Sequence, residues 1–157
     1  ENRLFATLDP TSRRLRFPRD FEAIITDTVG FLRDLPRDLI EAFRATLDEL
    51  SEAHVLVHVI DASSPRLAEQ VTSVESILAE LGLQHIPLIR VLNKEDLISP
   101  LRMAQLQREY DGIAISALDS STLTPLIHAL EEVLCRPLEM AGQKRLRLAK
   151  TPPGCSL

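Results

Sequence analysis

The residues best suited to chemistry form two short polar motifs, each of which follows an apolar stretch. The first is Asp27-Thr28-Val29-Gly30, directly after Ile24-Ile25-Thr26. An aspartate at a strand end can hold the water shell of a phosphate-bound Mg²⁺, and a glycine amide can approach a terminal phosphate because no Cβ blocks it. A four-residue pattern with two free positions is weak evidence by itself, so the interpretation depends on the second motif.

The second motif is Asn93-Lys94-Glu95-Asp96, which follows the apolar segment 88–92. The Asp96 carboxylate can accept both the ring N–H and the exocyclic amine of guanine, a pair of bonds that adenine cannot make. A site built around such polar groups discriminates by roughly 10⁴-fold. The Lys94 stem can lie against the base, and Asn93 can tie neighbouring loops. This motif therefore predicts a guanine reader.

A third segment, Ser116-Ala117-Leu118, follows the next apolar run and could place its backbone amides beside the guanine carbonyl oxygen. Taken singly, the three segments are also typical of a strand-end turn, a polar loop and a helix N-cap. Together, in this order after successive strands, they predict a site for GTP or GDP with Mg²⁺.

The hydrophobic pattern predicts the elements that must position these motifs. Alternation with a period of two, and repeats of three and four, predict the following order: strands over 13–17 and 21–26 forming an antiparallel hairpin, a helix over 39–50, a strand over 55–61, a helix from Ser64-Pro65 to Gly82, a strand over 87–92, a helix from Ser99-Pro100, a strand over 112–115 and a helix that ends before Pro137.

Strands that alternate with helices indicate a three-layer mixed α/β sheet with helices on both faces and right-handed crossovers. Ligands in such sheets bind at the carboxyl ends of the strands. Four polar residues, Asp27, Asp61, Asn93 and Ser116, end or follow predicted strands. The sequence therefore places its polar motifs at one edge of one sheet.

The composition is that of one ordinary globular domain, with 157 residues of which 45% are hydrophobic and 26% charged. We expect no stable membrane association, because His58 interrupts the longest apolar run and no signal peptide is visible. Two cysteines, Cys135 and Cys155, form no disulfide framework, which favours a reducing compartment and a cytoplasmic location.

A net charge of −5 argues against a DNA-binding protein, because phosphate neutralisation needs clustered basic residues. Basic clusters at 13–19 and 144–150 could contact a ribosome, although a solvated face for the first and a disordered basic tail for the second are the favoured interpretations. Residues 137–157, with Gly142 and Pro152-Pro153-Gly154, are predicted to be a linker or a disordered basic tail. The chain opens on Glu1, and we expect it to be part of a longer protein.

Three longer segments of the sequence resemble a known family. Over roughly residues 1–135 the chain is similar to the GTPase domain of HflX, a ribosome-associated GTPase of the Obg-HflX group, and the segments that carry this resemblance are Leu4–Arg14, Thr26–Pro36 and Ala42–Leu47. The resemblance implies a P-loop GTPase-like fold over 1–136. It also implies Mg²⁺-dependent GTP hydrolysis by a monomer that binds the large ribosomal subunit, its RNA and proteins, and that splits or rescues stalled ribosomes.

The same resemblance assigns roles to individual residues. It implies a first switch at Phe5, Ala6, Thr7, Leu8 and Asp9, with Thr7 as a Mg²⁺ ligand and Thr11 as the less favoured alternative. It implies a second switch at Asp27, Thr28, Val29 and Gly30, with Asp27 near the metal. The guanine reader would be Asn93, Lys94, Glu95 and Asp96. The loop that supports the base from behind would be Ser116, Ala117 and Leu118. Phe31 stands where a Ras-like enzyme has a water-positioning Gln, so no catalytic residue is assigned and slow intrinsic hydrolysis is expected.

One part of the family pattern is absent from the sequence. None of the five glycines precedes a lysine, so there is no GxxxxGK loop to cradle phosphates. In the family that loop lies just upstream of Glu1, with a strand before it and a helix after it. The strand sits at the middle of the sheet, between the strands that end at Asp27 and Asp61. We therefore expect a gap there, an inactive isolated chain, and loose folding or aggregation of these residues alone.

Weaker candidates stay outside the predicted site. His54 and His58 share a strand face, but no third metal ligand is apparent, and packed histidines are the simpler interpretation. Asp61-Ala62-Ser63 is explained as a strand end followed by a helix N-cap. Two other functions remain open: a non-catalytic interaction module derived from a GTPase domain, and another Obg-related GTPase in ribosome assembly.

Overall fold

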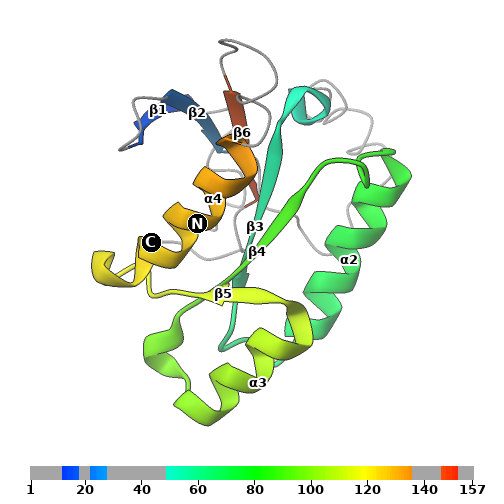
Figure 1. Cartoon of the computed structure of the whole chain (residues 1–157). Helices are drawn as coiled ribbons and strands as arrows, with labels where there is room; N and C mark the ends of the chain where they lie inside the picture. Colours follow the sequence, from blue (N-terminus) through cyan, green and yellow to red (C-terminus); the bar gives the residue numbers. More distant parts are fainter. Residues whose placement is uncertain (1–11, 18–21, 28–48, 136–145, 152–157) are drawn as a thin grey trace, which may run out of the picture.

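A computed structural model describes residues 12–17, 22–27, 49–135 and 146–151. They form a six-stranded sheet in the order β1-β2-β6-β3-β4-β5 (Figure 1). The strands are β1 (Ser12–Arg16), β2 (Glu22–Asp27), β3 (Val55–Asp61), β4 (Leu88–Asn93), β5 (Gly112–Ala114) and β6 (Leu146–Thr151); the helices are α2 (Leu67–Glu80), α3 (Pro100–Tyr110) and α4 (Thr124–Cys135), with short 3₁₀ turns η1 (Glu49–Glu52), η2 (Glu95–Leu97) and η3 (Ser120–Leu123).

The first two strands form the predicted antiparallel hairpin. Ser12 lies opposite Thr26 and Arg16 lies opposite Glu22. The Glu22 carboxylate contacts Arg14 at 3.2 Å and Arg16 at 3.1 Å. These pairs are largely exposed and add little to stability, about 0–1 kcal/mol each. The hairpin forms one end of the sheet, and most of the predicted helix over 39–50 lies outside the described residues.

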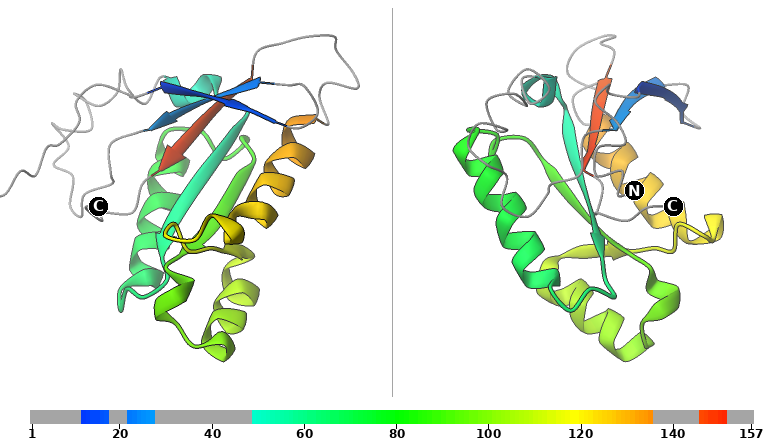
Figure 2. Two further views of the ribbon diagram at one scale, coloured as in Figure 1. Left: turned by 90° about the vertical axis from the view of Figure 1, so that its left-hand side faces the viewer. Right: turned by 180° about the vertical axis from the view of Figure 1, so that it is seen from behind.

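Strand β3 is buried on both faces, as its apolar run predicts. Val55, Val57 and Val59 belong to a core cluster that includes Leu130 and Leu134 of α4. On the opposite face of β3, Leu56 packs with residues of α2, and Ile60 packs with residues of α2 and α3. Figure 2 shows α4 on one side of the sheet and α2 and α3 on the other. The predicted three-layer α/β class is confirmed.

Local sequence signals explain where two helices begin and end. Ser99 is the N-cap of α3, where its Oγ accepts the Arg102 N–H at 3.4 Å and Pro100 occupies the first turn. Gly82, with φ of 70°, follows the end of α2 as predicted. However, α2 starts at Leu67, later than Ser64-Pro65 suggested, because Ser64 belongs to a preceding turn in which its N–H donates to the Asp61 carbonyl at 3.1 Å. None of the described helices has both the length and the apolarity to cross a membrane.

The largest difference from the expected fold is at the middle of the sheet. We predicted a linker or a disordered tail over 137–157 and an open gap between the strands that end at Asp27 and Asp61. Instead, residues 146–151 form β6, which lies parallel to both β2 and β3 and joins them (Figure 1). Ala149, for example, lies opposite Thr26 on one side and Leu56 on the other. The expectation of an open gap is therefore wrong.

A physical reason for this placement lies in the backbone. Two strands that face each other across an empty position would expose rows of unpaired N–H and C=O groups, each of which costs about 1–3 kcal/mol when buried without a partner. Any extended segment of suitable length can satisfy these groups, since main-chain pairing needs no particular side chains. The segment 146–151 supplies such a strand.

His58 is a buried titratable residue in the centre of β3, with 4% of its surface exposed. It lies opposite Arg90 of β4, and Arg90 pairs with Glu75 of α2 at 2.6 Å. The pKa of His58 is lowered from 6.5 to about 4, first because burial disfavours the charged ring and then because Arg90 repels it, an effect that Glu75 partly offsets. Nothing in the described residues forms a cluster of three or more metal-ligating side chains, so the packed interpretation of His58 stands.

The lowered pKa of His58 predicts that the fold loses stability in mild acid. Below 6.5 the unfolded chain binds a proton that the folded chain does not take up until the pH approaches about 4. The free energy of unfolding should therefore be fully retained above 6.5 and should fall by up to about 3 kcal/mol as the pH drops towards 4. Urea unfolding at a series of pH values measures this slope.

The variant His58→Leu tests the assignment, because it has a similar volume and cannot titrate. Its unfolding free energy should vary less with pH over this interval than that of the wild-type chain. The matched control is His85→Gln, which changes an exposed histidine and should keep the wild-type slope. An identical slope in His58→Leu would show that another group causes the acid sensitivity.

Candidate nucleotide site at the carboxyl edge of the sheet

The described polar residues of the predicted site gather at one edge of the sheet. Asp27, Asp61 and Asn93 are the last residues of β2, β3 and β4, and these strands run parallel. Asp61 lies directly opposite Asn93 in the register. Other predicted positions lie outside the described residues: Phe5 to Asp9, Thr28 to Gly30, and Phe31.

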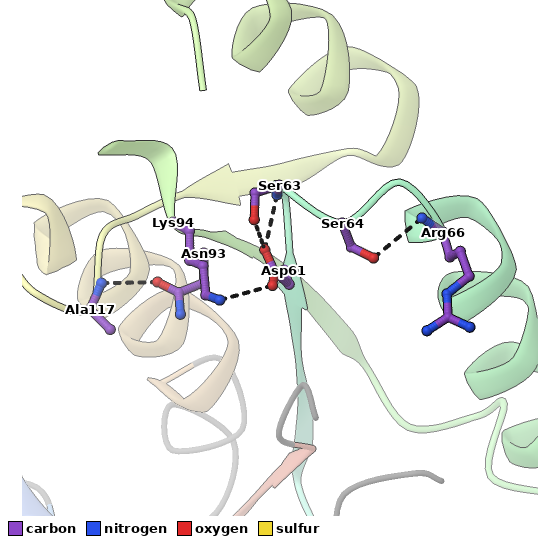
Figure 3. Close-up of polar contacts among 7 residues, drawn as sticks. All are labelled: Asp61, Ser63, Ser64, Arg66, Asn93, Lys94 and Ala117. Atoms are coloured by element: carbon purple, nitrogen blue, oxygen red, sulfur yellow. Dashed lines mark hydrogen bonds and ion pairs between the residues drawn. The ribbon is translucent and has the colours of Figure 1, made fainter. Parts of the chain in front are cut away.

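The loop after β4 is tied to the loop after β5 by Asn93. Its side-chain oxygen accepts the backbone N–H of Ala117 at 2.9 Å (Figure 3). Two residues further on, the Glu95 N–H donates to the Ile115 carbonyl at 3.1 Å. A side-chain bond and a backbone bond therefore fix the distance between these loops. This is the tying role that the sequence suggested for Asn93.

Ser116 connects the same two loops through Asp96. The hydroxyl of Ser116, a residue with 3% of its surface exposed, donates to Asp96 Oδ1 at 2.6 Å. Its backbone N–H donates to Thr122 Oγ1 at 2.9 Å, which anchors Ser116 to η3. Asp96 itself is exposed to solvent. A carboxylate has about four lone-pair sites, so the bond from Ser116 orients Asp96 and leaves capacity for two further donors.

Lys94 adopts a backbone conformation that is rare for its residue type, with φ of 68° and ψ of 39°. Its ammonium group lies 2.9 Å from Asp61 Oδ2. The other oxygen of Asp61 accepts the backbone N–H of Ser63 at 2.9 Å and its hydroxyl at 2.6 Å (Figure 3). Asp61 is thus joined to the predicted guanine reader, although we had left it outside the predicted site.

The surroundings of Asp61 favour its charged form. Burial alone would raise the pKa of the carboxyl, but the hydrogen bonds from Ser63 and the nearby Lys94 outweigh this and lower it below the usual 3.8. The ion pair is therefore present at neutral pH. No signal in the sequence indicated this pair, because the contact depends on the register of β3 against β4.

Asp27 is the described residue that could contribute to a Mg²⁺ site. It is exposed at the end of β2. Mg²⁺ prefers oxygen ligands and in phosphate sites usually takes one or two carboxylates, with phosphate oxygens and water completing the shell. A single carboxylate at this edge fits that requirement. The other predicted metal ligand, Thr7, lies outside the described residues.

The arrangement is suited to recognising a base. Asp96 offers acceptors, and Asn93 brings the backbone at Ala117 close to the loop that carries Asp96. The ammonium group of Lys94 is held by Asp61. The geometry therefore favours binding through hydrogen bonds at the carboxyl ends of the strands, which is where sheets of this class bind ligands.

Replacing Asn93 by alanine should separate the two loops. The Ala117 N–H would lose its acceptor, and the cost expected for an unsatisfied amide is about 1–3 kcal/mol. We expect about tenfold weaker GDP binding in calorimetric titrations. The control is Asn93→Asp, which keeps an oxygen at the same position and should bind better than Asn93→Ala. Equal affinity of Asn93→Ala and the wild type would show that this bond does not shape the site.

Comparison with known proteins gives consistent results. Residues 1–94 match a family model described as a 50S ribosome-binding GTPase. Three relatives carry the name GTPase HflX. The protein of Caldanaerobacter subterraneus subsp. tengcongensis is 44% identical over 142 residues, which are 90% of this chain and 32% of the relative. That of Magnetococcus marinus is 40% identical over 88% of this chain and 32% of the relative. That of Escherichia coli is 35% identical over 97% of this chain and 35% of the relative. The chain thus spans about a third of the length of these relatives.

Proposed function

Because the chain belongs to the HflX group of the GTPase family that its sequence matches, we propose that it forms the guanine-reading part of a Mg²⁺-dependent enzyme that hydrolyses GTP. The observation that supports this best is the bond from Ser116 to Asp96, at 2.6 Å, beside the bond from Ala117 to Asn93, at 2.9 Å. Together they hold one carboxylate and a row of backbone amides at the edge where a base would bind.

Base recognition follows from the chemistry of these groups. Asp96 would accept from the ring N–H and the amine of guanine. The Leu118 N–H, whose bond to Ser116 Oγ is long at 3.4 Å, would donate to the guanine carbonyl oxygen, whereas the Ala117 N–H already donates to Asn93 and holds the loop. Adenine presents an acceptor and no amine at the corresponding positions, so Asp96 would be left without its donors. Such a mismatch is what makes polar sites selective by about 10⁴-fold.

Binding of the phosphates is assigned to other parts of the protein. Asp27 would stand near the Mg²⁺ that bridges the phosphates, with Thr7 and the segments around Phe5 to Asp9 and Thr28 to Gly30 as the switches. The sequence has no GxxxxGK loop, so hydrolysis requires phosphate-binding groups that these residues do not supply. Phe31 cannot orient a water molecule as a glutamine does. We therefore propose slow intrinsic hydrolysis that a partner accelerates.

The proposed partner is the large ribosomal subunit, where the protein would help to split or rescue stalled ribosomes in the cytoplasm, as a monomer. Two facts support the ribosome as the partner. The matched family is described as a 50S ribosome-binding GTPase, and the arginines of β1 are exposed. Arg13, Arg14 and Arg16 lie in a strand at the end of the sheet, where phosphate groups of ribosomal RNA could approach them.

A non-catalytic binding module is the second candidate, and it would need only the base-reading groups of Asn93, Asp96 and Ser116 that the described residues contain. The two proposals differ in one respect. Both require guanine nucleotide binding at Asp96, but only the first requires turnover when phosphate-binding groups are present.

The test is GTP hydrolysis by the longer protein that contains this chain, measured as phosphate release with and without purified large ribosomal subunits. We expect slow release alone, clear stimulation by the subunits, and loss of activity in Asp27→Ala because the metal shell loses its carboxylate. The control Glu80→Gln, on the exposed side of α2, should behave as the wild type. Nucleotide binding without any phosphate release would instead support the non-catalytic module.

A further inference from the structure

We propose that Asp61 is a positioning residue, whose ion pair with Lys94 holds the loop 93–96 in its base-reading conformation before a nucleotide binds. This inference rests on the proposed function, since it concerns the loop that we assign to guanine recognition. It adds a residue that lies outside both polar motifs of the sequence. It also explains why Lys94 has a rare backbone conformation: the ion pair helps to impose it.

The ion pair is well placed to hold a side chain. The two charged groups are 2.9 Å apart, and only 14% of the Asp61 side chain and 31% of the Lys94 side chain are exposed. Asp61 is itself fixed, because its Oδ1 accepts two hydrogen bonds from Ser63. Charge-assisted bonds between partly buried groups are stronger than exposed ion pairs. Lys94 is therefore anchored to a rigid strand end.

The backbone on both sides of Lys94 is fixed as well. The Asn93 carbonyl accepts the Ala62 N–H at 3.0 Å, and the Glu95 N–H donates to Ile115 at 3.1 Å. Between these two bonds, Lys94 has a φ of 68°, a left-handed conformation that is strained for a residue with a Cβ. A conformation of this kind persists where neighbouring contacts impose it, and such residues are common at ligand clamps. The ion pair is the side-chain part of that constraint.

The expected consequence is preorganisation. If Lys94 loses Asp61, its long side chain regains freedom and the strained backbone has one anchor fewer. The free-energy cost of ordering the loop would then arise when the base binds, and this cost weakens the affinity for the nucleotide. Because the ion pair acts on the loop that contacts the base, and not on the phosphate-binding groups, the affinities for GDP and GTP should fall by the same factor.

The first test is amide hydrogen exchange by NMR on this chain without any nucleotide. In Asp61→Asn, the side-chain oxygen can still accept from Ser63, but the ion pair is removed. We expect exchange of the Glu95 and Ala117 amides to accelerate about tenfold. Lys94→Met keeps the stem and removes the same pair from the other side, so it should accelerate the same amides. In the double variant the two effects should not add.

The matched control is Glu75→Gln, which removes the ion pair between α2 and β4 and should leave exchange of these amides unchanged. Asp61→Glu keeps a carboxylate and should restore slow exchange in part, which loss of packing alone would not explain. Wild-type exchange rates in both Asp61→Asn and Lys94→Met would overturn the proposal. Acceleration throughout the sheet in both variants would do the same, because it would indicate general destabilisation.

The second test is titration of the same variants with GDP and GTP. We expect Asp61→Asn to bind both about five- to tenfold more weakly, with an unchanged ratio between them. If the exchange results hold but the wild-type chain and the longer protein fail to bind GDP, the proposed function fails while the positioning role of Asp61 stands. If both nucleotides bind Asp61→Asn as tightly as the wild type, the contribution of Asp61 to base reading is refuted.

Discussion

Replacing Asp96 by asparagine is expected to reverse the base preference of the site. The asparagine side chain keeps one acceptor oxygen but places an NH2 donor where the second carboxylate oxygen accepted, so the amine of guanine would meet a donor. Affinity for GTP should fall by a factor on the order of 10³ to 10⁴. Xanthosine triphosphate carries a carbonyl in place of the amine, so it should bind the variant better than GTP does. Competition titrations on the longer protein measure both affinities.

Two controls make this result specific to Asp96. Ser116 should still have an oxygen to donate to at position 96, so the bond of 2.6 Å between the loops can persist and the fold should be retained. Glu80→Gln removes an exposed carboxylate elsewhere and should keep the preference for GTP. If Asp96→Asn still prefers GTP, a residue other than Asp96 reads the base.

Deleting residues 146–157 is expected to abolish cooperative folding. Without β6, the backbone groups of β2 and β3 that now pair with it would lack partners in the interior of the sheet. At about 1–3 kcal/mol for each buried unsatisfied group, several such groups together cost as much as the 5–15 kcal/mol that typically stabilises a domain of about this size. Thermal unfolding followed by circular dichroism should show a sharp transition for the full chain and a broad one, or none, for the shortened chain.

Two further variants separate the strand from the rest of the C-terminus. A chain that ends at residue 151 keeps β6 and should unfold as the full chain does. Ala149→Pro removes one N–H from the middle of β6, opposite Thr26 and Leu56, and should destabilise the fold by about 1–3 kcal/mol, the cost of a buried backbone group left without its partner. If the chain lacking 146–157 unfolds at the temperature of the full chain, β6 does not hold the sheet together.

Much of the fold could be predicted because its signals are local. The continuous apolar run of β3 indicates a strand buried on both faces, and the structure confirms it. Ser99-Pro100 gives the start of α3, and Gly82 follows the end of α2. The start of α2 was predicted too early because Ser64 has the residue type of an N-cap but hydrogen-bonds within a turn. Capping residues and turn residues share the same chemistry, so sequence alone does not separate them.

The position of β6 could not be predicted, because it depends on contacts distant in the sequence. The segment Leu146-Arg147-Leu148-Ala149-Lys150 alternates apolar and basic residues in part, which is compatible with a strand. Gly142 and Pro152-Pro153 on either side favoured a tail instead. Whether such a segment pairs depends on which strand edges are open elsewhere, and this is a property of the assembled sheet.

The sequence predicts the polar groups of the candidate site and the tie made by Asn93, but not the ion pair of Asp61 with Lys94. The motifs at Asn93 to Asp96 and Ser116 to Leu118 gave the polar groups, and strand order gave their common edge. The ion pair of Asp61 with Lys94, and the left-handed backbone of Lys94, depend on the register of β3 against β4. Spacing in the sequence does not encode that register, so Asp61 was explained as a simple strand end.

The central claim is that the edge formed by Asn93, Asp96 and Ala117 reads a guanine base, and the most direct measurement is an NMR titration of this chain. Amide spectra would be recorded with GDP and, separately, with ADP at equal concentrations, a method that also detects weak binding. We predict that GDP shifts the amide signals of Asp96, Ala117 and Leu118 and that ADP leaves them in place. Equal shifts with both nucleotides would contradict the claim, and so would the absence of shifts with GDP in the longer protein that contains this chain.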